Sequence, residues 1–114
     1  MAMAAFKHSD MLLNRVDVID TEQMALARRM ELDYAPRPLM VDPTRDLLIV
    51  GGWLDGRARF YQLSTMSELD VSVEFGPYLR DFAYEVERGV LFAGSKCGVF
   101  EFDVHSRLGS KVAD

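Results

Sequence analysis

Two stretches of this chain repeat one another at a constant distance, and this repeat constrains the fold more than any other feature. Arg45 and residues 47–51 match Arg88 and residues 90–94 at an offset of 43 positions. The same offset pairs Arg37 with Arg80, well before the matching apolar runs. A period of this length is typical of folds in which one supersecondary unit occurs more than once. The sequence therefore predicts a repeat architecture.

The spacing of apolar residues favours strands over helices as the repeating element. Residues 71–75 alternate apolar and polar with period two, as expected for a strand that covers a core with one face. Residues 47–50 are apolar on both faces, as in a strand of a sheet packed between two others. Repeats of about 40 to 45 residues occur in propeller blades and in helical solenoids. With strands, the period predicts an all-β chain, an incomplete β-propeller made of four-stranded antiparallel blades.

One segment favours another local structure when it is taken alone. Residues 21–32 are rich in good helix formers and follow Asp20, which could cap a helix N-terminus. The segment at the equivalent position of the next repeat, residues 66–75, has the pattern of a turn followed by a strand. Because equivalent positions of a repeat share their structure, we expect a strand, and a helix remains the alternative.

Two long segments of the sequence carry a family resemblance. The segment VDVIDTEQMALARRMELDYAPRPLMVDPTRDLLIVGG resembles a blade of the YVTN and quinoprotein-like β-propellers. The segment YLRDFAYEVERGVLFAGSKCGVFEFD is similar to blades of bacterial regulator-type propellers. The WD40 signature is incomplete, because Leu54 follows Trp53 where aspartate is expected and no Gly-His pair precedes the strands. The resemblance implies a WD40-like propeller fold, and it implies little about function because such blades serve unrelated activities.

The repeat divides the chain into four expected segments. Residues 1–20 are a partial blade of outer strands, residues 21–63 and 64–103 are blades, and residues 104–114 are a tail that could begin the first strand of a further blade. Propellers have at least four blades, which at this repeat length need roughly 170 residues. We therefore expect this incomplete propeller to be completed by other propeller segments or by copies of the same chain.

Composition and missing motifs exclude several function classes. The formal charge of −5, without basic blocks, is unfavourable for nucleic acid. No run of about 18 apolar residues predicts a membrane span, and no signal peptide is recognisable, so the compartment is undefined. The sequence contains no catalytic motif, no metal-ligand spacing and no cofactor loop, so we expect a protein without catalytic residues, metal or cofactor.

Three isolated residues have side chains that can take part in chemistry, and each has a simpler interpretation. His8 and His105 are far apart in the sequence, and each is expected to be a solvated or hydrogen-bonded loop residue. Cys97 is the single cysteine and follows Lys96, whose charge could favour the thiolate. An inert loop cysteine is the favoured interpretation.

The candidate binding residues are Tyr34, Arg37, Tyr78, Arg80 and Trp53. One set is Tyr34 with Arg37, and the other is Tyr78 with Arg80. Both sets precede equivalent strands, so successive blades would present them on a shared face. Tyr, Trp and Arg are also the side chains enriched in binding hot spots. The alternative is structural: each Arg would bond carbonyls of the adjoining loop, each Tyr would pack over the blade edge, and Trp53 would cover its neighbour.

These observations predict a non-catalytic interaction or scaffold module that binds another protein through the loops of a rigid propeller segment. The alternative is part of a larger sensory or cofactor-binding propeller, similar to the quinoproteins, that binds a small ligand at its channel. A ring of convergent acidic or metal-binding residues on the channel face would favour that alternative, and on that face only Arg37 and Arg80 recur.

Overall fold

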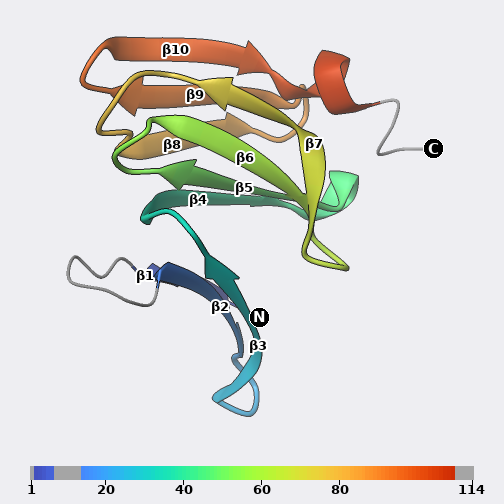
Figure 1. Cartoon of the computed structure of the whole chain (residues 1–114). Coiled ribbons are helices and arrows are strands. Elements are labelled where there is room, and N and C mark those ends of the chain that lie inside the picture. Colours follow the sequence, from blue (N-terminus) through green and yellow to red (C-terminus); the bar gives the residue numbers. More distant parts are fainter. Residues whose placement is uncertain (1, 7–13, 110–114) are drawn as a thin grey trace.

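The described residues form ten strands and two short helical turns (Figure 1). The computed structural model describes residues 2–6 and 14–109. The strands are β1 (Ala2–Phe6), β2 (Asn14–Asp20), β3 (Ala25–Leu32), β4 (Pro36–Asp42), β5 (Leu47–Gly52), β6 (Arg57–Gln62), β7 (Ser67–Glu74), β8 (Asp81–Glu85), β9 (Val90–Ser95) and β10 (Gly98–Asp103). The helical turns are η1 (Pro43–Arg45) and η2 (His105–Gly109).

The strands form three sheets that follow one another in the chain. The first sheet has the order β1-β2-β3, the second β4-β5-β6-β7 and the third β8-β9-β10. Every neighbouring pair is antiparallel. Strand β4 contacts β1 of the first sheet and β8 of the third, and Figure 1 shows the second sheet between the other two. The prediction of an all-β, antiparallel chain is confirmed.

Strand β5 explains why one segment is apolar on both of its faces. All six of its residues are buried. Leu47 and Ile49 belong to a cluster shared with Leu91 of the third sheet. Leu48 and Val50 belong to a second cluster, shared with Val16 of the first sheet. Alternate residues of β5 thus fill two different cores, as the period-two geometry of a strand requires.

The second and third sheets use the same strand register. In the second sheet Leu39 of β4 pairs with Val50 of β5. In the third sheet Phe82 of β8 pairs with Ala93 of β9, and both of these partners lie 43 positions later in the chain. The offset found in the sequence is therefore also an offset between hydrogen-bonded pairs.

Residues 21–32 form a turn followed by a strand, as preferred above, and not a helix. Strand β3 pairs with β2 from Ala25 opposite Asp20 to Leu32 opposite Asn14. Asp20 caps the turn, since its Oδ1 accepts a 3.0 Å hydrogen bond from the backbone N–H of Glu22. Pairing with β2 satisfies the backbone groups that a helix would have satisfied internally.

The sheets begin and end one strand away from the expected boundaries. Strand β3 was expected to open the unit 21–63 but completes the first sheet, and β7 was expected to open the unit 64–103 but completes the second sheet. The β6–β7 hairpin is closed by the N–H of Met66, which donates a 2.7 Å hydrogen bond to the carbonyl of Gln62. The third sheet consequently has three strands among the described residues.

Some expectations fall on parts of the chain that the structure does not describe. His8 lies outside the described residues, as do residues 110–114 of the tail that could begin a further blade. Gly109 itself ends the helical turn η2.

A buried carboxylate joins the second and third sheets. Asp42, at the end of β4, is fully buried. Its oxygens accept hydrogen bonds from the hydroxyl of Thr44 at 2.6 Å, from Nη1 of Arg45 at 2.8 Å and from the hydroxyl of Tyr84 at 2.5 Å. Arg45 Nη1 also donates to the carbonyl of Val86, beyond the end of β8, at 2.7 Å. Burial alone would raise the pKa of Asp42, but these hydrogen bonds and the charge of Arg45 lower it below its ordinary value.

Candidate functional site

Four of the five candidate residues gather around one indole ring. The guanidinium carbon of Arg37 lies 4.6 Å from the centroid of the Trp53 ring, and that of Arg80 lies 5.7 Å from it. The ring of Tyr78 is tilted against Trp53, with centroids 5.1 Å apart. The ammonium group of Lys96 lies 5.6 Å from the centroid of the Tyr78 ring. We refer to Arg37, Trp53, Tyr78, Arg80 and Lys96 as the Trp53 cluster.

Backbone hydrogen bonds to two connecting segments hold Trp53 in place. The N–H of Trp53 donates to the carbonyl of Ala35 at 2.7 Å. The carbonyl of Trp53 accepts from the N–H of Leu79 at 3.2 Å, and Leu79 is itself fully buried. The turn that carries Trp53 is thus tied to the connections before β4 and before β8.

The cations of the cluster are also fixed through their backbones. Arg37 lies in β4 between Pro36 and Pro38, which are buried while the Arg37 side chain is exposed. The N–H of Arg80 donates a 2.9 Å hydrogen bond to the carbonyl of Gly94. Since alternate side chains of a strand point to opposite sides, the buried prolines direct Arg37 outward.

Tyr78 has an unusual backbone conformation. Its φ angle is +61°, in the left-handed region that costs energy for a residue with a bulky side chain. Its neighbour Pro77 accepts a 3.0 Å hydrogen bond from the N–H of Lys96, which fixes this connection against the β9–β10 turn. Strained residues of this kind are concentrated at functional sites. The strain places the Tyr78 ring between Trp53 and Lys96.

The Trp53 cluster is a local concentration of positive charge on an acidic protein. None of the ion pairs found among residues 14–109 involves Arg37, Arg80 or Lys96. All three side chains are exposed, and the chain as a whole carries a charge of −5. Cations over aromatic faces are stabilised by the ring quadrupole and keep their hydrogen-bond donors available. The cluster can therefore bind carboxylates or other anions.

Tyr34, the fifth candidate, lies outside this cluster. Its hydroxyl is 2.6 Å from the hydroxyl of Tyr61, and its ring lies under the guanidinium of Arg59, with 3.9 Å between the guanidinium carbon and the ring centroid. Burial, followed by the Tyr61 hydrogen bond, raises the pKa of Tyr34. Arg59 is also held by Asp55 through a 2.7 Å hydrogen bond. Tyr34 thus packs against the core cluster that contains Val16 of the first sheet and Leu48 of the second.

Lys96 was not among the residues singled out from the sequence. A signal for it was present, because Lys96 stands 43 positions after Trp53 and therefore at the equivalent position of the repeat. Lysine and tryptophan differ so much in chemistry that their equivalent positions in the repeat do not suggest a shared site. Only the fold shows that both side chains contact the ring of Tyr78.

Two other residues with chemically reactive side chains lie apart from the cluster. Cys97 is exposed in the β9–β10 turn, where its N–H donates to the hydroxyl of Ser95 at 3.1 Å. Nδ1 of His105 lies 3.4 Å from Nη2 of Arg45. Within the described residues, no group of three or more His, Cys, Asp or Glu side chains is arranged to hold a metal ion.

Comparisons with protein families and with curated proteins give no match for this chain. Among the described residues, no helix is both long and apolar enough to cross a bilayer.

Proposed function

We propose that the chain is a segment of a WD40-like β-propeller in which each sheet is one blade. The second sheet is then a complete four-stranded blade, and the first and third sheets are blades of which the described residues form three strands each. Three observations support the proposal: the shared register at an offset of 43, the burial of β5 on both faces, and the contacts of β4 with both neighbouring sheets. The sheet edges that remain would be covered by other propeller segments or by copies of this chain.

The function we propose is protein binding without catalysis, with the Trp53 cluster as the docking site for an acidic segment of a partner protein. The observation that carries this proposal is the stacking of Arg37, Arg80 and Lys96 on two aromatic rings, without ion pairs to described carboxylates. Tyr, Trp and Arg dominate interface energetics. Arginines held in place lose little entropy when they bind carboxylates in a bidentate manner.

Trp53 provides the readout for this proposal because it is the only tryptophan in the chain. A decaglutamate peptide should change the fluorescence of Trp53, and its affinity should fall as salt is raised. Replacing Arg37 and Arg80 together by Gln should weaken the affinity by about tenfold or more, because two charged hydrogen-bonding groups are lost.

Replacing Arg57 and Arg88 together by Gln is the matched control, since this variant also loses two positive charges and both arginines lie outside the cluster. This variant should bind the peptide as the parent protein does. Equal loss of affinity in both variants would show that the peptide responds only to total charge. Unchanged binding by the Arg37/Arg80 double variant would exclude the cluster as the docking site.

A further inference from the structure

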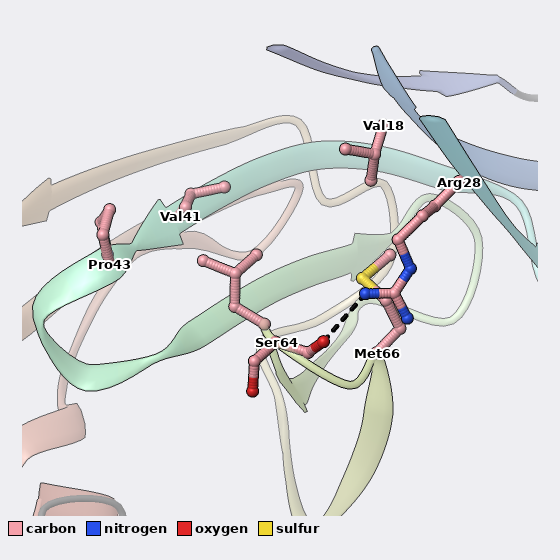
Figure 2. A pocket seen from close by; sticks show the side chains of 7 residues that line it. Val18, Arg28, Val41, Pro43, Ser64 and Met66 are labelled. Atoms are coloured by element: carbon pink, nitrogen blue, oxygen red, sulfur yellow. Dashed lines mark hydrogen bonds between the residues drawn. The ribbon is translucent and has the colours of Figure 1, made fainter. Parts of the chain in front are cut away.

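A second site lies between the first and second sheets, away from the Trp53 cluster. It is a cavity of about 430 Å³ next to the end of β4 and the β6–β7 turn. Figure 2 shows side chains from β2, β3, β4 and the β6–β7 turn around it. Its wall is mostly apolar, and the lining residues are Val18, Arg28, Val41, Pro43, Leu63, Ser64 and Met66.

The equivalent space between the second and third sheets is filled by aromatic side chains. Phe60 of β6 stands where Val18 stands in β2, 42 positions earlier, and is fully buried. Tyr84 of β8 stands where Val41 stands in β4, 43 positions earlier, and packs against the same core. Two valines thus replace a phenylalanine and a tyrosine. Since protein interiors are normally packed without large voids, this difference in side-chain size accounts for the cavity.

A cation borders this apolar space. Nη1 of Arg28 donates a 2.9 Å hydrogen bond to the carbonyl of Ser64, and Nη2 donates to the carbonyl of Thr65 at 3.1 Å. Figure 2 shows the Arg28 guanidinium beside Ser64 and Met66. A guanidinium has five N–H donors, so these two bonds leave others for a ligand. The bonds to the turn also hold the guanidinium in position at the cavity.

We propose that this cavity binds a small apolar carboxylate, with its carbon chain between Val18 and Val41 and its carboxylate on Arg28. Ligand sites have volumes of about 300–1,000 Å³, and a cavity of about 150 Å³ already holds benzene. The space therefore suits a chain of about eight to ten carbon atoms. An apolar tail is stabilised by burial against the apolar wall, and its one charged head group pairs with the one guanidinium at the border.

This site is independent of the proposed protein docking. Arg37 and Val41 lie near opposite ends of β4, about 13 Å apart along the strand. Octanoate should therefore bind without changing the fluorescence of Trp53. Failure of one proposal leaves the other standing, because the two sites share no residue.

The first test compares octanoate with octan-1-ol by titration calorimetry on the full chain. Octanoate should bind more tightly than the alcohol, because only the carboxylate pairs with Arg28. In Arg28→Gln the affinity for octanoate should fall by about tenfold, while the affinity for octan-1-ol stays the same. Absence of octanoate binding to the parent protein at millimolar concentration would overturn the proposal, as would an equal effect of Arg28→Gln on both probes.

The second test fills the cavity with the side chain found in the other inter-sheet space. Val18→Phe should abolish binding of octanoate and of octan-1-ol. Val86→Phe, the same replacement at an exposed position outside the cavity, should leave both affinities unchanged. If Val18→Phe binds octanoate as tightly as the parent protein, the cavity is not the site. Should Val18→Phe fail to fold, Arg28→Gln still decides, because Arg28 is an exposed residue whose replacement leaves the core intact.

Discussion

The hydroxyl of Tyr84 donates a 2.5 Å hydrogen bond to the buried carboxylate of Asp42 and thereby connects β8 to the end of β4. The pair spans two sheets whose described strands are not joined by backbone pairing. Burial, together with the hydrogen bond to Asp42, raises the pKa of Tyr84, so the hydroxyl keeps its proton and remains a donor. Sheet-to-sheet geometry in this chain thus depends on a polar contact as well as on the apolar core.

Replacing Tyr84 by Phe should destabilise the protein by about 1–3 kcal/mol, because Asp42 loses one of its donors while it stays buried. Urea denaturation followed by circular dichroism measures this difference. Glu85→Gln is the control, since Glu85 pairs with Arg88 at the same three-residue spacing as Asp42 with Arg45, but on the surface. It should change the stability little. Equal effects of the two variants would show that the buried contact has no special weight.

Stability should fall on acidification. Hydrogen bonds and charge from Arg29 and Arg15 lower the pKa of Asp17, and those from Thr44, Tyr84 and Arg45 lower the pKa of Asp42, below the ordinary value of 3.8. A carboxylate with a lowered pKa in the folded state stabilises that state above the unfolded pKa, and the contribution is lost as the pH falls through the folded-state pKa.

The free energy of unfolding should therefore decrease when the pH is lowered from 5 towards 3. Denaturant titrations at intervals of pH measure the slope. Asp42→Asn should give a shallower slope over this range, because one of the shifted groups is gone. A slope that matches the parent protein would contradict the assignment of the lowered pKa to Asp42.

Part of this fold could be predicted from the sequence because its strands repeat a pattern that does not depend on long-range contacts. The offset of 43 and the double-sided apolar run 47–50 correspond to observed strands and cores. Sheet membership was misjudged by one strand. The loop 33–35, which passes between sheets, is shorter than the turn 21–24, which closes a hairpin within one sheet. Loop length therefore could not identify the sheet boundary.

The candidate site was partly predictable for the same reason. The recurrence of Arg37 and Arg80 identified two cations, but their convergence on one indole follows from the packing of β4 beside β8. Tyr34 could not be separated from Tyr78 by residue type. One tyrosine is held by Tyr61 and Arg59 in a core, whereas the other lies at a strained surface position.

The turn between β2 and β3 contains a residue whose backbone strain can be removed by substitution. Met24 has φ +54° and is 80% exposed, so its side chain contributes little packing. A left-handed conformation costs an ordinary residue about 1–2 kcal/mol, and glycine avoids this cost while losing some entropy on folding. Met24→Gly should therefore raise the stability, by up to about 1 kcal/mol.

Thermal unfolding compares Met24→Gly with Met66→Gly. Met66 has φ +62° at the equivalent turn but packs against the core cluster of Val16 and Leu48. Its replacement should lower the stability, because lost burial exceeds the relief of strain. A loss of stability in Met24→Gly as large as that in Met66→Gly would show that backbone strain is not the deciding factor at this turn.

The last prediction concerns the outer edge of the third sheet. Within the part of the chain that the structure describes, β10 is the edge strand there, whereas its equivalent β6 is paired with β7 in the second sheet. Val99 of β10 is 79% exposed, and Phe100 is 37% exposed. An apolar edge with unpaired backbone groups favours association with another strand. We therefore expect the chain to self-associate at micromolar concentration when no other segment is present.

Val99→Lys should reduce this association, because a lysine on an edge strand disfavours pairing with another chain and Val99 contributes little to the core. Multi-angle light scattering measures the mass, and thermal unfolding shows that the fold is retained. Glu101→Gln, on the same strand, adds no lysine and removes no apolar side chain, so it should leave the association unchanged. If the parent protein is a well-behaved monomer under these conditions, the third sheet needs no further strand, and the proposal that other segments or copies complete the propeller is wrong.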